Sequence, residues 1–150
     1  MKDLSIEEQI AILLNTYSNL ALHYTASKIR HGKVKYLCLR YNGYVVGTVG
    51  IQKVNYYLTE IKHLCVMPNF RGKGLAKKLI RMAVDAVPTS LAISTIRAEN
   101  ESSQAVLKSL GFEQQTAFRS KYDGGEVRLF TYSTINNEKP AALENAINGD

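Results

Sequence analysis

Cysteine is scarce in this chain, which has only Cys38 and Cys65 among its 150 residues. Two thiols do not build a disulfide framework, and without a Cys-x-x-Cys pair the sequence offers no structural zinc site. Both cysteines lie in apolar, strand-like runs. We therefore expect them to be reduced core residues of a cytoplasmic protein that uses no metal.

Long apolar runs are also missing. No stretch of the sequence approaches the roughly 18 consecutive apolar residues of a membrane-spanning helix. The N-terminal Met-Lys-Asp, followed by a polar helix start, lacks the basic-then-apolar pattern of a signal peptide. We expect no membrane partner, and a single domain over residues 1–134 with a polar tail over residues 135–150.

Acidic residues are almost absent from the middle of the chain. Between Lys28 and Arg81 there are twelve lysines and arginines and a single carboxylate, Glu60, and the whole chain has a net charge of +6. This distribution favours an anionic ligand. Two other interpretations stay open, a solubilising surface and contacts to the phosphates of a nucleic acid.

Hydrophobic periodicity and turn residues predict the element order ααβββαβαββ. A Ser-x-x-Glu capping box at Ser5 begins the first helix, and a second is predicted over 20–29. Asn42-Gly43 predicts a tight hairpin. The fold class is therefore α/β (α+β), a mixed, mostly antiparallel sheet of about six to seven strands with flanking helices. Strands are predicted over 34–41, 44–53, 56–67, 91–98, 113–122 and 126–133, and the later helices over 74–87 and 101–110.

The sequence Arg-Gly-Lys-Gly-Leu-Ala, residues 71–76, follows an apolar strand and a turn at Pro68, and it begins an amphipathic helix. Backbone N–H groups at a helix start have no intrahelical partner and lie at the positive end of the helix dipole, so they bind phosphate. The pattern differs from both common glycine loops. The P-loop motif is absent, and Lys77 replaces the third glycine of a dinucleotide fingerprint. A phosphorylated cofactor is therefore predicted.

Val66, Pro68 and the loop at residues 71–76 resemble the acetyl-coenzyme A loop of the GNAT acetyltransferases (Gcn5-related N-acetyltransferases). The strand at 91–98, Asn100, a short helix and Leu-Gly-Phe-Glu at 110–113 resemble the second cofactor motif of that family. The resemblance covers roughly residues 44–130. It implies the GNAT-like acyl-CoA N-acyltransferase fold and acetyl-CoA as co-substrate.

The resemblance also implies where the cofactor binds. The strand that precedes the loop is expected to splay from its neighbour and to leave backbone groups free for the pantetheine arm, with the N–H of Cys65 or Val66 as oxyanion donor. The pantetheine is expected along Leu64, Cys65 and Val66 with a hydrogen bond to Asn100, and the pyrophosphate on Arg71, Gly72, Lys73, Gly74, Leu75 and Ala76.

Glu60 is the predicted general base. It lies six residues before Val66, where the histone-type members of the family carry their glutamate base, and burial there would raise its pKa. The alternative is that Glu60 forms an ion pair with Lys62 or Lys53. His63 is a second candidate, and a β-bulge would decide which side chain faces the cleft.

The general acid is where the sequence departs from the family pattern. Many members have a tyrosine seven residues after the motif asparagine, and here that position is Leu107. Ser103 either faces the thiol or caps its helix. Tyr122 and Tyr132 of the final hairpin are further candidates, and the other alternative is that the thiolate leaves without a side-chain acid.

These motifs predict an N-acetyltransferase that moves acetyl from acetyl-CoA to a primary amine by direct attack in a ternary complex. The acceptor is a protein lysine, a protein N-terminus or a small amine, in a pocket to which Tyr17, Tyr24, Tyr56 and Tyr57 are candidates to contribute. Two alternatives stay open: a GNAT-type toxin that acetylates aminoacyl-tRNA, and a non-catalytic acyl-CoA-binding module. A homodimer is also left open.

Overall fold

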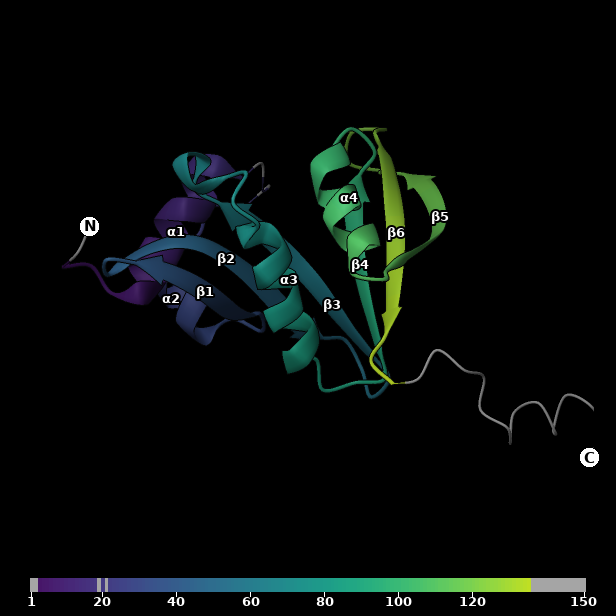
Figure 1. Ribbon diagram of the computed structural model, residues 1–150, viewed down its shortest axis with the longest axis horizontal. Coiled ribbons are helices and arrows are strands. Elements are labelled where there is room, and N and C mark those ends of the chain that lie inside the picture. Colours follow the sequence, from purple (N-terminus) through teal and green to yellow (C-terminus); the bar gives the residue numbers. More distant parts are fainter. Residues whose placement is uncertain (1–2, 19, 21, 136–150) are drawn as a thin grey trace, which may run out of the picture.

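The computed structural model describes residues 3–18, 20 and 22–135 (Figure 1). In this part of the chain, no helix is long and apolar enough to cross a membrane. One six-stranded sheet has the strand order β1-β2-β3-β4-β6-β5. Its strands are β1 (Lys35–Tyr41), β2 (Tyr44–Lys53), β3 (Leu58–Val66), β4 (Leu91–Arg97), β5 (Glu113–Arg119) and β6 (Glu126–Ser133). The helices are α1 (Ile6–Tyr17), α2 (Ala26–His31), the short 3-10 helix η1 (Pro68–Phe70), α3 (Leu75–Ala86) and α4 (Glu101–Ser109).

The predicted element order is confirmed, and so are two of its local signals. At the start of α1, the Ser5 hydroxyl oxygen accepts from the Glu8 N–H at 3.1 Å. The Glu8 carboxylate accepts from the Ser5 hydroxyl rather than from the Ser5 N–H, so only half of the capping box forms. In the β1–β2 hairpin, Asn42 and Gly43 have φ of 49° and 82°, as a type I′ turn requires.

The second helix was predicted wrongly at its start. It begins at Ala26 instead of residue 20, because Thr25 is its N-cap and accepts from the Lys28 N–H at 3.2 Å. Just before the cap, the Asn15 side chain donates to the Tyr24 carbonyl and accepts from the Tyr24 N–H, both at 2.8 Å. This pairing satisfies both backbone groups of Tyr24 outside a helix. The predicted tail lies outside the described residues from residue 136 onward.

The sheet opens between β3 and β4, which pair in parallel only over three residues, Leu58–Glu60 with Leu91–Ile93. Beyond that point β3 stays paired with β2 to Val66, while β4 stays paired with β6 to Arg97. The two halves of the sheet therefore diverge, as Figure 1 shows. At the fork the Ser94 hydroxyl donates to the Ile61 carbonyl at 2.9 Å, replacing the backbone ladder that ends there.

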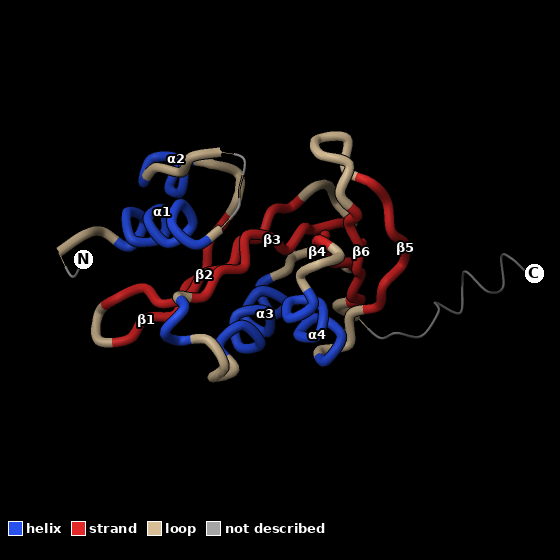
Figure 2. The backbone as a smooth tube through the Cα atoms, turned by 90° about the horizontal axis from the view of Figure 1, so that it is seen from above, coloured by secondary structure: helices blue, strands red, loops and turns tan. Residues whose placement is uncertain are grey.

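Helices cover both faces of the sheet. Figure 2 shows α1 and α2 on one side and α3 and α4 on the other. The larger core lies under α3 and α4, and its fully buried members include Ile61, Leu79 and Phe130. The smaller core joins α1 to β2 and β3 and contains Leu13 and Cys65. The sheet is thus held from both sides, and the fork between β3 and β4 is its open part.

Candidate active site

The glycine loop adopts the conformation that its composition predicts. Gly72 and Gly74 have φ of 76° and 78°, in the left-handed region, and Gly74 is the N-cap of α3. A Cβ atom built at either glycine would meet nothing within 4 Å. The glycines are therefore needed for their backbone angles, and the space beside them is open.

Six successive N–H groups of this loop, those of residues 72–77, donate to no acceptor among the described residues. The bonds resume on either side, where the Arg71 N–H donates to the Pro68 carbonyl at 3.2 Å and the Lys78 N–H to the Gly74 carbonyl at 3.1 Å. Together with the dipole of α3, these groups make a site for a negatively charged ligand.

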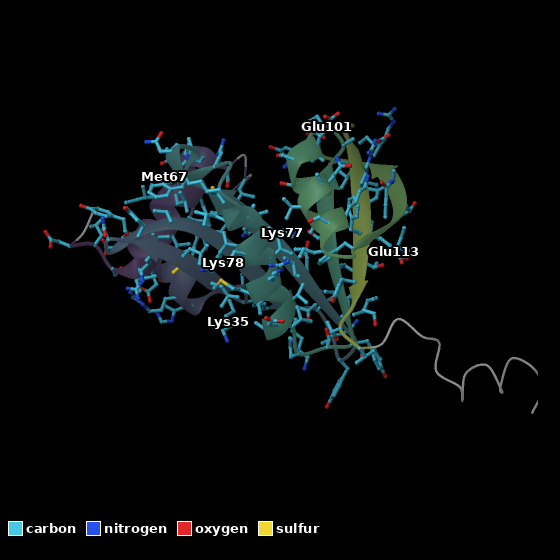
Figure 3. All side chains as sticks on the ribbon, viewed as in Figure 1. Lys35, Met67, Lys77, Lys78, Glu101 and Glu113 are labelled. Atoms are coloured by element: carbon cyan, nitrogen blue, oxygen red, sulfur yellow. The ribbon has the colours of Figure 1, made fainter. Side chains whose placement is uncertain are left out.

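A hollow of about 580 Å³ runs from this loop along β3 to the start of α4. Lys77, labelled in Figure 3, lies on α3 beside it. The ammonium of Lys73 instead lies 5.3 Å from the centre of the Phe70 ring, and Lys73 does not line the hollow. All other predicted cofactor residues do: Leu64, Cys65, Val66, Arg71, Gly72, Gly74, Leu75, Ala76 and Asn100.

The edge of β3 that faces the hollow carries free backbone groups. The Met67 N–H donates to Val46 of β2 at 2.8 Å, so by strand alternation the N–H of Cys65 also points to β2. The N–H groups of Val66 and Leu64 then point to the open edge. The Val66 carbonyl accepts from Arg71 Nε at 3.0 Å. Of the two predicted oxyanion donors, only Val66 has its N–H on the free edge.

Asn100 caps α4 at the far wall of this hollow. Its Oδ1 accepts from the Ser103 N–H and from the Ser102 hydroxyl, each at 3.2 Å. Its amide nitrogen has no hydrogen bond within the described part of the chain, so the side chain keeps one donor for a ligand.

A second, smaller hollow of about 270 Å³ lies at the fork between β3 and β4. The three predicted catalytic residues, Glu60, His63 and Ser103, all line it. Ser103 and Leu64 line both hollows, which therefore meet at these two residues.

A β-bulge in β3 turns the chain between the two hollows. Thr48 pairs with Cys65 but Gly50 pairs with Lys62, so two residues of β3 stand opposite one residue of β2. His63, inside the bulge, has a φ of 57°. Ile61 before the bulge and Leu64 after it both face the α3 core. The bulge thus reverses the alternation of side chains between the two faces of the sheet. As a result Glu60 and His63, three residues apart, both line the smaller hollow.

Glu60 forms the ion pair that was the alternative to its role as base. Its Oε1 lies 3.3 Å from Lys62 Nζ, with one quarter of each side chain exposed. Lys62 also donates to Gln52 Oε1 at 3.3 Å. Lys53 is not the partner, because its ammonium lies over the Tyr56 ring.

His63 is held between two tyrosines. Its Nδ1 lies 2.7 Å from the Tyr36 hydroxyl, and the rings of Tyr36 and Tyr24 lie against it at 5.9 and 5.4 Å between centroids. Burial, and after it the charge of Lys62, lowers the pKa of His63 to about 4. Burial, and after it Tyr24, raises the pKa of Tyr36. At neutral pH the imidazole is therefore uncharged and the phenol is protonated.

We expect His63 to make stability depend on pH. Because its pKa falls from 6.5 in the unfolded chain to about 4 in the folded one, the unfolded state binds the proton first as the pH drops. Its contribution is complete above pH 6.5 and is lost between pH 6.5 and 4. After discounting for solvent screening, the loss should be about 1–2 kcal/mol.

Urea unfolding of the wild type and of His63→Asn at pH 7, 5.5 and 4 measures this loss. Asparagine tolerates the left-handed backbone and does not titrate in this range. The wild type should lose more stability than the variant over that interval. If the free energy of unfolding falls equally with pH in the wild type and in the variant, the pKa of His63 is the same in the folded and the unfolded chain.

The structure places no tyrosine where a thiol would be protonated from the final hairpin. Tyr122 is 83% exposed in the β5–β6 turn, and Tyr132 packs on Phe112 with 5.0 Å between ring centroids. Neither lines either hollow, so the structure does not support these two candidates for the acid. Leu107 is buried in the α3 core. The Ser103 hydroxyl makes no hydrogen bond among the described residues and stays available at the junction.

Tyrosines also differ in their suitability for the acceptor pocket. Tyr56 and Tyr57 are 85% and 76% exposed at the β2–β3 turn, away from both hollows. Tyr24 contacts His63, and Tyr17 lines the larger hollow. Leu20 and Ser94 line the smaller hollow and were not predicted. Around Ser94 the sequence shows only an apolar strand pattern, and such a pattern does not indicate where β3 and β4 separate.

Residues 6–112 match the model of the acetyltransferase (GNAT) family. The chain belongs to this family. This membership confirms the resemblance drawn from the loop and from the second cofactor motif. The two halves of that resemblance come from different parts of the chain, and the fold brings both to the larger hollow.

Individual proteins agree with this assignment. The chain is 27% identical over 90 residues to the N-alpha-acetyltransferase RimI of Mycobacterium tuberculosis. The match spans 58% of this chain and only 56% of the length of that relative. The ribosomal-protein-S18-alanine N-acetyltransferase of Escherichia coli superposes with a TM-score of 0.71 at 16% identity, over 91% of this chain and 94% of its own. A Salmonella typhimurium protein described as an acetyltransferase with its cofactor acetyl-CoA gives 0.68 at 18%, covering 91% and 90%. At such identities the two structures establish the fold, and the predicted fold class is confirmed.

Proposed function

We propose that this chain transfers the acetyl group of acetyl-CoA to a primary amine by direct attack within a ternary complex. The observation that carries the proposal is the run of six N–H groups at residues 72–77 that have no acceptor within the described part of the chain and that face a hollow along the free edge of β3. A pyrophosphate fits the N–H groups, and an extended amide-containing arm fits a free strand edge.

The cofactor would run along β3 in one direction only, from the loop toward the smaller hollow. With its pyrophosphate on the loop, the pantetheine arm passes Val66 first and Leu64 second, toward the junction with the smaller hollow. The N–H groups of these two residues lie about 7 Å apart along the strand. Val66 then pairs with the pantetheine, and Leu64 is the N–H that stabilises the oxyanion. The free amide nitrogen of Asn100 supplies a further donor to the arm.

The chemistry takes place where the hollows meet. Glu60 accepts a proton from the ammonium of the acceptor, directly or through water, after the ammonium replaces Lys62 beside it. The amine nitrogen bonds to the carbonyl carbon and then loses its second proton to solvent, the oxyanion collapses, and the carbon–sulfur bond breaks. The Ser103 hydroxyl hydrogen-bonds to the leaving thiolate, which takes its proton from solvent. His63, held by Tyr36, stays neutral and orients the acceptor.

The acceptor we propose is an α-amine at the N-terminus of a protein. The likeness to RimI, which is an N-alpha-acetyltransferase, supports this choice. A carboxylate beside an opening in the sheet also suits an ammonium at the end of an extended chain. Neither the tRNA-directed alternative nor the non-catalytic one is favoured by a feature of the site.

Isotopically labelled acetyl-CoA with a peptide panel tests the proposal. The panel contains peptides with a free N-terminus, the same peptides with a blocked N-terminus and an internal lysine, and spermidine. Mass spectrometry should find the label on free N-termini and not on the blocked peptides. If no amine in the panel or in a peptide library gains the label, the proposed reaction is wrong.

A further inference from the structure

The smaller hollow passes through the fork and has two chemically different halves. On the face covered by α1 and α2 it presents the polar groups of Glu60, Lys62 and His63, with Leu20 beside them. On the face covered by α3 and α4 it presents mainly aliphatic side chains, together with the two serines Ser94 and Ser103. These aliphatic side chains are Ile61, Leu64, Ile80, Ile96 and Leu107.

The aliphatic half has little to hold water, because its one hydroxyl without a partner among the described residues is that of Ser103 at its mouth. The Ser94 hydroxyl, its buried polar group, is already donated to the Ile61 carbonyl at 2.9 Å. Among the described residues, no buried side-chain nitrogen or oxygen lacks a hydrogen bond. An apolar cavity of this kind stays dry and binds apolar groups. This half is therefore a site for hydrocarbon.

The position of this half identifies the hydrocarbon. Because Leu64 and Ser103 line both hollows, the thioester of a bound cofactor ends at the mouth of the aliphatic half. The amine approaches along the carboxylate on the opposite face. We propose that the aliphatic half binds the acyl chain of the cofactor, and that this chain uses acyl-CoAs with about four to six carbons as well as acetyl-CoA. The inference rests on the proposed function and extends it.

The volume of the hollow limits the length of the acyl chain. The whole hollow is about 270 Å³, and its aliphatic half is a fraction of that. An apolar cavity of about 150 Å³ accommodates benzene, which has six carbons, so the half takes about two to four carbons beyond acetyl. The reaction balances as for acetyl: the nitrogen–carbonyl bond forms, the carbon–sulfur bond breaks, Glu60 takes the first ammonium proton, the nitrogen releases its second proton to solvent, and solvent protonates the thiolate.

Isothermal titration of the whole chain with CoA, acetyl-CoA, butyryl-CoA and hexanoyl-CoA tests the pocket. Each methylene that is buried should tighten binding about fourfold, so butyryl-CoA, with two more methylenes, should bind about 15-fold more tightly than acetyl-CoA. Equal or weaker binding of butyryl-CoA would overturn the pocket while leaving acetyl transfer intact. If CoA itself does not bind, the proposed function fails and the pocket fails with it.

A variant that fills the pocket gives a second, independent measurement. Ile96→Phe places a ring in the aliphatic half and should lower the ratio of butyryl-CoA to acetyl-CoA affinity about tenfold. Ile12→Phe, at a position 39% exposed on α1, adds the same ring away from both hollows and should keep the wild-type ratio. An unchanged ratio in Ile96→Phe would contradict the assignment. The chain-length series on the wild type decides the question even if Ile96→Phe does not fold.

Discussion

Gly74→Asp is expected to weaken acetyl-CoA binding by about 30- to 100-fold. The position is the N-cap of α3, where aspartate ordinarily favours the helix, and a Cβ there meets nothing within 4 Å. The loss therefore comes from a carboxylate beside the pyrophosphate, a repulsion of about 2–3 kcal/mol at an effective dielectric constant of about 20. Isothermal titration with acetyl-CoA at low and moderate salt measures it.

Two matched variants separate charge from backbone strain. Gly74→Asn has nearly the shape of aspartate, tolerates the left-handed φ of 78° and should weaken binding only a few-fold. Gly124→Asp adds the same charge at a second open glycine, with a φ of 76°, in the β5–β6 turn. It should leave the affinity unchanged. Equal affinities of Gly74→Asp and Gly74→Asn would remove the phosphate site from this loop.

Glu60→Gln is expected to lower kcat for amine acetylation at pH 7 by about 10²-fold or more, with acetyl-CoA affinity within twofold of the wild type. A positioned general base contributes about 10²–10⁴-fold, and glutamine keeps the shape without accepting a proton. Glu60 lines the smaller hollow and not the larger one, so cofactor binding should not change. Steady-state kinetics with a free N-terminal peptide, beside titration with acetyl-CoA, gives both quantities.

Lys62→Gln is the control for the ion pair. If Glu60 served only to pair with Lys62 across their 3.3 Å contact, removing either partner should lower kcat alike. If Glu60 is the base, Lys62→Gln should keep kcat within a few-fold, because the carboxylate is then more available to the substrate ammonium. A large loss in Lys62→Gln with little loss in Glu60→Gln would reverse the roles.

The cofactor site was predictable because its parts are local. The glycines at 72 and 74, the helix that follows them and the cap at Asn100 each depend on a few neighbouring residues and on backbone angles that side-chain type controls. Lys73 shows the limit of this approach. The motif puts it inside the loop, but the direction of its side chain, over Phe70, depends on η1 and was not predictable.

The catalytic half was less predictable. The choice between Glu60 and His63 depended on a bulge, and a bulge is visible only in the register between β2 and β3. Which lysine forms the ion pair with Glu60 depended on which one lies on the same face of the sheet. Tyr122 was a candidate for the acid, but the β5–β6 turn places its side chain in solvent.

By itself the sequence determined the order of elements, the β1–β2 hairpin, the anion loop and membership of an acetyl-CoA-using family, because turn residues, periodicity and caps act over a few residues. Only the tertiary structure decided that β3 and β4 part after three residue pairs, that the two hollows meet at Leu64 and Ser103, and that one half of the smaller hollow is aliphatic. These features arise from contacts between segments far apart in the chain, and no local pattern encodes a space that several elements enclose together.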